Sequence, residues 1–381
     1  MVEEEEEKEK EGQAEFNQFE WYYKKEFEWK CIANNNYKRF TYLGGVNGIE
    51  KATIMKLITV DAKEYKTLLK EVYFLSCFKR NIYFTEIIDT FLSNECEKLY
   101  LYIILREEGT DLKSLIEKND FNYNEKIPNI SRYIIFQIVC GLKILHENYL
   151  SHNDIKPGNI LVSPTGKTKI CDLGSTDKIG RIRGNGTNGY LSPQAILKKN
   201  RTNEDDMYAV GIVFLELLTK KIGLFSTEGK NKEEQLKFIL ENYYDIKYGN
   251  YEWNQNINYN VIVNCIKEDK YNKFESKLKD NLFLDNEDEN NKELIKNLLE
   301  INPTKRKTAG QVLNEKMFKD AKLYFVDSDF DYEEKDYQKF FSNDINENTF
   351  KKHIETIREK FIGKTTLDKR QIKKPEVNFE N

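Results

Sequence analysis

The stretch LSHNDIKPGNILV, residues 150–162, combines an acid, a lysine and an amide at short spacing. Asp154 is followed by Lys156 and then by Asn159 within the same loop-like run. In phosphoryl transfer, a carboxylate orients an attacking hydroxyl and accepts its proton, a lysine neutralises the moving phosphoryl group, and an amide oxygen can bind Mg²⁺. The stretch therefore predicts a phosphoryl-transfer site, with Asp154 and Lys156 as catalytic residues and Asn159 as a metal ligand.

A second carboxylate follows at Asp172, within KICDLG at residues 169–174. The residues between Asn159 and Asp172 have the pattern of a short hairpin. A carboxylate brought close to an amide oxygen is suited to Mg²⁺ that bridges phosphates. We therefore expect Asp172 to be the second metal ligand.

The chain around these motifs has a β-rich first part and a helical second part. Aromatic and β-branched residues between Asn-rich and Gly-rich breaks predict three strands within residues 28–60, and a buried strand is predicted within residues 98–109. Helical spacing predicts helices in residues 62–78, 130–150 and 205–221. This order predicts a chain of the α+β class, with the change from strands to helices near residue 107.

Composition excludes several classes of protein. The 381 residues carry a formal net charge of −4, so no basic surface indicates nucleic acid as the main partner. Six cysteines without a CxxC pair argue against a disulfide scaffold or a zinc site. No apolar run reaches the roughly 18 residues that span a bilayer, and the acidic N-terminus is unlike a signal segment. We therefore expect an intracellular protein, cytoplasmic or nuclear, with no membrane span.

Five motifs, in order along the chain, resemble those of eukaryotic protein kinases. Residues 152–159 resemble the catalytic loop H-R-D-x-K-x-x-N, and residues 172–174 resemble D-F-G. Residues 186–194, GTNGYLSPQ, resemble the end of the activation segment, whose usual last triplet is A-P-E. Asp206 resembles the buried helix aspartate that holds the catalytic loop, and Arg306 resembles the arginine that pairs with the A-P-E glutamate. Five motifs in this order make the resemblance specific.

The resemblance covers residues 26–320 and implies a two-lobed protein-kinase-like fold, with a β-rich N-lobe and a mainly helical C-lobe. It implies ATP and Mg²⁺ as cofactors and protein hydroxyls as substrates. Lys56 is then the strand lysine that holds the α- and β-phosphates, and Glu71 on the following helix is the partner that fixes it.

The resemblance also implies a set of nucleotide contacts. Counting back from Asp111, which is expected to meet the ribose, places the gatekeeper at Ile104 and the adenine-binding backbone from Leu105 to Glu107. Ile54 stands where the family prefers a small residue above the adenine. The residues implied to bind the nucleotide are Lys56, Glu71, Ile32, Phe40, Ile54, Ile104, Leu105, Glu107, Asp111 and Leu161.

The glycine-rich stretch TYLGGVNGIE, residues 41–50, invites interpretation as the phosphate-binding loop. In the implied fold that loop joins the first two strands, so a second strand and a turn must separate it from Lys56. Strands and hairpin loops of ordinary length require about a dozen residues, but Gly48 lies only eight residues before Lys56. Residues 41–50 therefore predict the turn between the second and third strands. The phosphate loop falls at residues 32–40, which contain none of the family glycines, and a weakened nucleotide grip is expected.

Other departures from the family concern the activation segment. Asn153 replaces the arginine that normally binds a phosphate on this segment, and residues 178–186 contain no Ser, Thr or Tyr. The arginine that would bind the phosphate and the residues that would carry it are thus both absent. Their joint absence predicts activity without activation-loop phosphorylation. Gln194 replaces the glutamate that would pair with Arg306, so a neutral hydrogen bond is expected there.

The substrate class follows from Lys156 and Thr187, which resemble those of serine/threonine kinases. We predict a serine/threonine protein kinase, loosely like the cyclin-dependent and MAP kinase group. The departures keep open an alternative, a pseudokinase that serves as a nucleotide-binding scaffold with weak or no transfer. A small-molecule kinase also uses an H-N-D loop, but residues 186–194 and Arg306 argue against it.

The resemblance and the composition together predict four regions. An apolar stripe at Phe350, Ile354, Ile357 and Phe361 predicts one helix at about residues 347–362. The regions are an acidic disordered tail at 1–25, an N-lobe at 26–107, a C-lobe at 108–320 with an insert at about 243–290, and a C-terminal extension at 321–381.

Overall fold

The chain divides into two compact units in a computed structural model, and it returns to the first unit after completing the second. The first unit comprises Met1–Glu107 and Ser328–Asn381, and the second comprises Glu108–Asp327. The structure describes residues 30–35, 39–44, 53–95, 98–119, 130–181, 186–197, 200–226, 234, 236, 238–240, 288–318, 330–341 and 344–363. The predicted acidic tail and nearly all of the predicted insert lie outside these residues.

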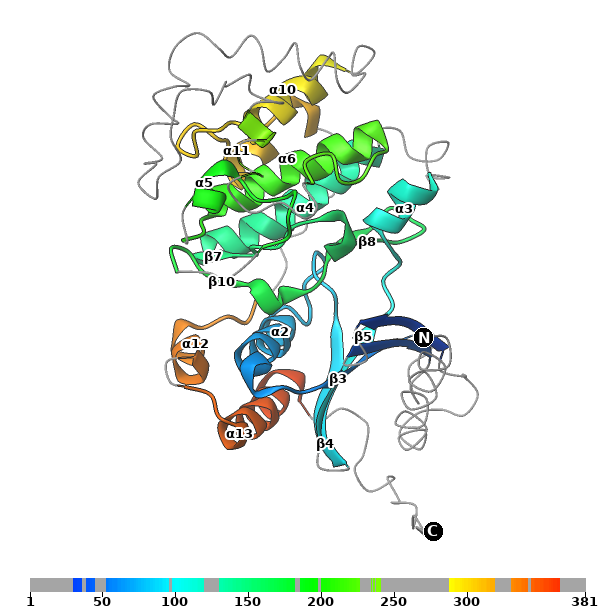
Figure 1. Ribbon diagram of the computed structural model, residues 1–381, viewed down its shortest axis with the longest axis vertical. Helices are drawn as coiled ribbons and strands as arrows, with labels where there is room; N and C mark the ends of the chain where they lie inside the picture. The colour runs from blue at the N-terminus through cyan, green and yellow to red at the C-terminus, as the bar shows by residue number, and fades with distance from the viewer. Residues whose placement is uncertain are drawn as a thin grey trace. The chain divides into compact units, whose positions relative to one another are not determined.

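Five strands of the described residues form an antiparallel sheet in the first unit, in the order β1-β2-β3-β5-β4 (Figure 1). They are β1 (Lys30–Asn35), β2 (Arg39–Gly44), β3 (Thr53–Thr59), β4 (Ile87–Glu95) and β5 (Lys98–Arg106). Along β3, Met55 and Leu57 are buried, whereas Ile54 and Lys56 lie on the half-buried face. The three strands predicted within residues 28–60 and the strand predicted within residues 98–109 are confirmed.

Strand β4 is not predicted from the sequence, because a carboxylate interrupts its apolar pattern. Asp89 is 2% exposed, and Arg358, which lies 269 residues later, donates through Nε and Nη2 to its two oxygens at 2.7 Å. A buried charge is tolerated when it is paired and hydrogen-bonded. The partner that makes Asp89 compatible with a buried strand is thus invisible to a local reading of residues 87–95.

The connection between β2 and β3 is the glycine-rich stretch. Gly44 ends β2 and pairs with Thr53, the first residue of β3. Residues 45–52 therefore join two antiparallel neighbours, and the predicted position of this stretch between the second and third strands is confirmed. The conformation of residues 45–52 lies outside the described residues, as does that of residues 36–38 between β1 and β2.

Helix α2 (Tyr65–Cys77) carries a large aromatic cluster in the first unit, after the short 3-10 helix η2 (Ala62–Glu64). The C-terminal residues of the chain supply the other half of this cluster. They form α12 (Glu334–Phe341), α13 (Glu347–Ile357) and the π-helix η8 (Arg358–Ile362). Tyr73 of α2 has ring contacts with Phe74, Tyr332, Tyr337, Phe340, Phe341 and Phe361.

The C-terminal helices pack on α2 and β4 (Figure 1). Phe350 of α13 stacks on Tyr65 of α2, with ring centroids 4.8 Å apart. Together α13 and η8 occupy residues 347–362, the segment in which the sequence predicts a helix. The structure adds α12, which is not predicted from the sequence, because four of its eight residues are charged and its aromatic contacts come from α2.

The second unit is mainly helical. Its described helices are α3 (Leu112–Lys118), α4 (Ile130–Glu147), α5 (Pro193–Leu197), α6 (Asn203–Thr219), α10 (Glu289–Leu298), α11 (Ala309–Leu313) and the 3-10 turn η6 (Lys316–Phe318). Helix α6 is central, because it packs against both α4 and α10. Gly211 permits the close approach to α10, since a Cβ there would lie 2.9 Å from the Cβ of Leu298. The long helices predicted around residues 130–150 and 205–221 are confirmed.

Short strands and turns carry the predicted catalytic residues of the second unit. One small sheet has the order β6 (Thr110–Asp111), β8 (Ile160–Val162) and β9 (Thr168–Ile170), and another pairs β7 (Leu150–Ser151) with β10 (Asp177–Lys178). The 3-10 turns η3 (Pro157–Asn159) and η4 (Leu173–Ser175) precede β8 and follow β9. The two units together match the predicted α+β class, and no described helix is long and apolar enough to cross a membrane.

Gly109 is required where the chain enters this small sheet. Its φ is +120°, and a Cβ there would lie 2.2 Å from the carbonyl oxygen of Val162. Gly109→Ala should therefore lower the free energy of unfolding by about 2–4 kcal/mol, because both the backbone conformation and the space exclude a methyl group. Urea denaturation measures this loss.

Gly310→Ala is the matched control for that substitution. A Cβ at Gly310 meets no atom within 4 Å, and the residue lies in helix α11, where alanine is favoured by roughly 0.5–1 kcal/mol. Equal stability of the Gly109→Ala and Gly310→Ala proteins would show that the backbone at residue 109 is not constrained as described.

Candidate active site

The carboxylate of Asp154 is the centre of a polar network in the second unit. The Lys156 ammonium donates to Oδ2 at 2.8 Å, and Nδ2 of Asn159 donates to the same atom at 3.1 Å. The Thr187 hydroxyl donates to Oδ1 at 2.6 Å, and Thr187 also accepts a hydrogen bond from Lys156 at 2.8 Å. The structure thus brings together four residues that the sequence singles out. The hydrogen bonds of the other three residues hold the Asp154 carboxylate in one orientation.

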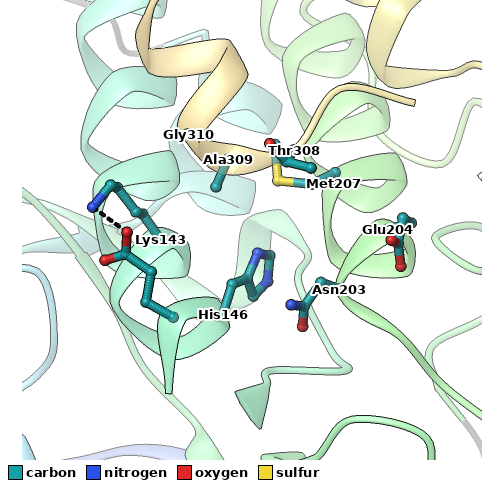
Figure 2. A pocket seen from close by; sticks show the side chains of 9 residues that line it. Lys143, His146, Asn203, Glu204, Met207, Thr308, Ala309 and Gly310 are labelled. Atoms are coloured by element: carbon teal, nitrogen blue, oxygen red, sulfur yellow. Dashed lines mark ion pairs between the residues drawn. The ribbon is translucent and has the colours of Figure 1, made fainter. Parts of the chain in front are cut away.

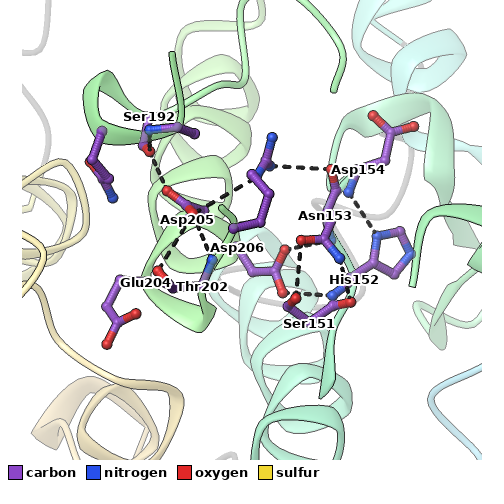
Figure 3. Close-up of polar contacts among 12 residues, drawn as sticks. Ser151, His152, Asn153, Asp154, Ser192, Thr202, Glu204, Asp205 and Asp206 are labelled. Carbon is purple, nitrogen blue, oxygen red and sulfur yellow. Dashed lines mark hydrogen bonds and ion pairs between the residues drawn. The ribbon is translucent and has the colours of Figure 1, made fainter. Parts of the chain in front are cut away.

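The loop that carries Asp154 is held by a buried carboxylate of α6 (Figure 3). The backbone N–H groups of His152 and Asn153 donate to Asp206 at 2.8 Å each, and His146 lies 3.1 Å from the same carboxylate. Burial alone would raise the pKa of Asp206, but the hydrogen bond and charge of His146, together with His152 and Asn153, outweigh it and lower that pKa. Asp206 therefore stays ionised and anchors the loop, as the sequence predicts.

His152 has a structural role in this loop. Its ring is 0% exposed, accepts from the backbone N–H of Asp154 at 3.2 Å, and lies 3.4 Å from the carbonyl of Cys171. With Nδ1 accepting, Nε2 carries the proton and donates to Cys171. The histidine therefore links the catalytic loop to the residue before Asp172.

The two predicted metal ligands lie at the same end of the β8–β9 hairpin. Ile160 pairs with Ile170, and the backbone N–H of Cys171 donates to the carbonyl of Asn159 at 2.9 Å. Asn159 is thus hydrogen-bonded to Cys171, the residue that immediately precedes Asp172. Asp172 has a left-handed backbone with φ 59°, which is uncommon for a residue other than glycine.

In the first unit, Lys56 and Glu71 form the predicted ion pair. The ammonium of Lys56 lies 2.7 Å from Oε1 of Glu71, and the side chains are 27% and 4% exposed. The pair joins β3 to α2. Because Glu71 is nearly buried, removal of Lys56 would leave a carboxylate that depends on this partner for much of its compensation.

The sheet register shows on which face of the sheet the predicted gatekeeper lies. Ile104 is paired with Met55, on the buried face of β3, whereas Leu105 is paired with Ile54, on the face that carries Lys56. Directly paired residues point to the same side of a sheet, and a shift of one residue reverses the side. Ile104 therefore lies on the face away from Lys56, and Leu105 is the β5 position opposite Ile54.

Ile32 and Phe40 lie on the two strands that border the predicted phosphate loop. The pairing of β1 with β2 shifts between Cys31 and Ala33, so Ile32 is the extra residue of a β-bulge. Phe40 is paired with Leu57 of β3. The positions of Ile32 and Phe40 are therefore set by the backbone register of the sheet. Glu107, another predicted nucleotide contact, is the last residue of the N-terminal segment of the first unit.

Asp111 and Leu161 lie opposite each other in the second unit. They are paired between β6 and β8. The Asp111 carboxylate caps helix α3, because it accepts from the backbone N–H and the hydroxyl of Ser114 at 2.9 and 2.7 Å. Asp111, which is predicted to contact the ribose, thus also has a structural role. Glu108, three residues earlier, forms an ion pair at 2.7 Å with Lys169 of β9.

Two of the departures from the family have clear structural substitutes. The Asn153 amide donates to the carbonyls of Ser151 and Ser175, at 2.7 and 3.0 Å. Gln194 accepts from Arg306 at 3.1 Å, which is the neutral hydrogen bond predicted from the sequence. Both neutral side chains therefore form connections where the family uses charged ones.

Sequence reasoning missed two buried charges near these motifs. Arg201, just before α6, is 6% exposed and donates to the carbonyl of Asn153 at 3.2 Å. Glu216 of α6 accepts from the Tyr190 hydroxyl at 2.8 Å and from the Gly223 N–H at 2.6 Å. Burial raises the pKa of Glu216, and these hydrogen bonds oppose the shift. A charge inside or just before an apolar helix is the sequence signal that could have drawn attention to both residues.

A cavity of about 250 Å³ lies apart from these residues, between the ends of α4, α6 and α11 (Figure 2). Figure 2 shows His146, Asn203 and Met207 around it. Of its lining, only His146 connects to the catalytic loop, through Asp206. The cavity is therefore not formed by the predicted nucleotide contacts.

Comparison with known proteins gives the family to which this fold and these motifs belong. Residues 46–318, well over half of the 381 residues, match the protein kinase domain, and the chain therefore belongs to the protein kinase family. The described β-sheet unit and helical unit agree with the two-lobed architecture of that family.

Its relatives include MAP kinases. Extracellular signal-regulated kinase 1 of Dictyostelium discoideum is 31% identical over 202 residues, which are 50% of this chain and 37% of that protein. Mitogen-activated protein kinase 17 of Arabidopsis thaliana is 32% identical over 158 residues, which are 38% and 31%. Serine/threonine kinase NLK of Caenorhabditis elegans is 30% identical over 183 residues, which are 46% and 28%. The matches thus span about a third of each of these relatives.

Proposed function

We propose that this chain is a serine/threonine protein kinase that transfers the γ-phosphate of ATP to hydroxyl groups of proteins. The observation that carries the proposal is the set of donors around the Asp154 carboxylate. Lys156, Asn159 and Thr187 all donate to it, at 2.6–3.1 Å. A carboxylate held this firmly is suited to accept the proton of an attacking hydroxyl, which is the role of a general base in phosphoryl transfer.

The chemistry of the predicted metal ligands fits Mg²⁺. Asn159 and Asp172 supply amide and carboxylate oxygens, and Mg²⁺ prefers one or two such protein ligands together with phosphates and water. The Asn159 amide donates through Nδ2 to Asp154, so its Oδ1 is the atom directed to a cation. When bound, the cation supplies neutralisation of charge on the phosphates.

The remaining proposed roles belong to residues of this chain. Lys56 binds the α- and β-phosphates, and Glu71 holds its ammonium at 2.7 Å, so no reorganisation is needed during transfer. Lys156 lies beside Asp154 and neutralises the moving phosphoryl group. Ile54 and Leu105 border the adenine from the sheet, and the predicted contacts of Ile32, Phe40, Glu107, Asp111 and Leu161 are part of the same proposal.

We further propose that this activity does not require phosphorylation of the activation segment. The Asn153 amide supports this proposal, since it joins the catalytic loop to the carbonyl of Ser175 without any phosphate. Residues 178–186 also offer no Ser, Thr or Tyr to a kinase. Two further points stay predictions: the domain boundaries at residues 26, 107 and 320, and the cellular compartment of the protein.

Lys56→Met is the experiment that tests this function. Transfer of labelled γ-phosphate from Mg·ATP to a generic protein substrate should fall by about 10²-fold or more, because one electrostatic contact to the reacting phosphates is lost. Lys63→Met is the matched control, since Lys63 is 77% exposed on η2 of the same unit, and it should transfer at the wild-type rate.

Two outcomes would contradict the proposal. Equal transfer by the wild type and by Lys56→Met would reject the assignment of Lys56. Stabilisation of the wild type by Mg·ATP in a melting experiment, without any transfer, would instead favour the nucleotide-binding scaffold that the glycine-free residues 32–40 keep open.

A further inference from the structure

A buried guanidinium lies behind the catalytic loop of the second unit. Arg201 is 6% exposed, and its Nη2 donates to the backbone carbonyl of Asn153 at 3.2 Å. Its Nε lies 3.7 Å from Oδ2 of Asp205, the carboxylate that also caps α6 at Thr202. Arginine is rarely buried unless it is paired, so such a residue requires an explanation.

The activation segment meets the same guanidinium at Gly186. A Cβ at Gly186 would lie 2.8 Å from Nη1 of Arg201 and 3.5 Å from the carbonyl oxygen of Asn153. The backbone at residue 186 can approach this closely because it has no side chain. Asn153, Gly186 and Arg201 therefore meet at one point.

Two of these three residues immediately precede residues of the candidate active site. Asn153 precedes Asp154, and Gly186 precedes Thr187. Asp154 and Thr187 are joined by the hydroxyl of Thr187 at 2.6 Å and by its N–H at 3.3 Å. The Arg201 side chain thus lies against Asn153, which precedes Asp154, and against Gly186, which precedes Thr187.

We propose that Arg201 is a positioning residue, which fixes Asp154 and Thr187 relative to each other through Asn153 and Gly186. The proposal rests on the proposed kinase function, and it adds a residue that the family motifs do not assign. A guanidinium suits this role because its planar donors point in several directions, whereas an ammonium is a single compact charge. The carbonyl of Arg201 also accepts from the N–H of Gly180 at 2.9 Å, so the same residue holds the start of the activation segment.

The charge environment agrees with this role. Burial raises the pKa of Asp205, and the positive charge of Arg201 is the strongest influence that opposes the shift. The Ser192 hydroxyl donates to the other oxygen of Asp205, which connects the end of the activation segment to the same pair. Arg201 and Asp205 therefore form a buried pair to which three parts of the segment attach: residues 180, 186 and 192.

Arg201→Gln tests the proposal through steady-state kinetics of the full chain. The substitution should lower kcat by about 10- to 100-fold, because misplacement of a catalytic group by a fraction of an ångström to an ångström has effects of this size. The KM for ATP should change by less than about threefold, since no predicted nucleotide contact is altered. Arg201→Lys should recover part of kcat, as one donor can still reach Asn153 or Asp205.

Arg132→Gln is the matched control. Arg132 lies on α4 of the same unit, donates through Nε to Oδ1 of Asn291 at 2.7 Å, and forms an ion pair with Asp288 at 2.8 Å, and neither partner belongs to the activation segment. Its loss should leave kcat within about threefold of wild type. A wild-type kcat for Arg201→Gln, or a fall no larger than that of Arg132→Gln, would overturn the proposal.

Two further measurements keep the proposal decidable. If Arg201→Gln does not fold, Gly186→Ala probes the same contact from the other side, and a wild-type kcat for that variant would overturn the proposal. If the wild type transfers no phosphate, the kinase function fails, and hydrogen exchange then decides the positioning role. Amides 186–192 should exchange faster in Arg201→Gln than in Arg132→Gln, and equal rates would reject the positioning role.

Discussion

Asp154→Asn should lower the rate of phosphate transfer by about 10²–10⁴-fold, which is the usual contribution of a general base. Asparagine has nearly the same shape. Its one oxygen can accept from Lys156 and Asn159 while its amide nitrogen donates to the Thr187 hydroxyl, so most of the network around residue 154 is kept. What is lost is the negative charge that accepts the proton of the attacking hydroxyl. Labelled phosphate transfer under saturating Mg·ATP measures the change.

Asp288→Asn is a control of the same chemistry in the same unit. Asp288 caps helix α10 on the protein surface, and asparagine caps helices equally well. The control should transfer phosphate at the wild-type rate. Wild-type transfer by Asp154→Asn would show that another group, or none, acts as the base, and it would remove the main support for the proposed function.

Arg358→Met should lower the free energy of unfolding by about 3 kcal/mol, the lower end expected when one partner of a buried ion pair is removed. The side chain of Asp89 is 3% exposed, and Arg358 reaches both of its oxygens at 2.7 Å. Methionine keeps most of the apolar contact of η8 but leaves the carboxylate without its countercharge. Urea denaturation of the full chain measures the loss.

Two variants show whether the loss comes from the unpaired charge. Lys351→Met removes the half-buried partner of Glu347 on α13, and an ion pair four residues apart on a helix surface contributes at most about 0.5 kcal/mol. Adding Asp89→Asn to Arg358→Met should restore more than half of the lost stability, because the uncompensated charge is then gone. If the double variant is less stable than Arg358→Met alone, the loss arises from packing and not from the ion pair.

The grouping of the predicted catalytic residues follows from information that is local in the sequence. Asp154, Lys156 and Asn159 lie within six residues, so one loop brings them together whatever surrounds it. The ion pair of Lys56 with Glu71 was implied by the family resemblance, and it joins a strand and a helix that are adjacent in sequence. In both cases, the spacing along the chain limits where the side chains can go.

The gatekeeper assignment depends on information of a different kind. A count of residues fixes a position to within one, but in a strand an error of one residue reverses the face. Only the register of β5 against β3, which pairs Ile104 with Met55 and Leu105 with Ile54, identifies the residue on the side of Lys56. That register depends on hydrogen bonds between strands, which single-strand patterns do not encode.

The sequence by itself determined the protein kinase family and most of the strands and helices around the predicted site, β4 and α12 excepted, because these depend on patterns among neighbouring residues. Only the tertiary structure decided which buried charges are paired. Asp89 with Arg358, and Arg201 with Asn153 and Gly186, meet through folding of segments that are distant along the chain. Burial of a charge is costly until its partner is in place, so these residues acquire their roles only in the folded protein.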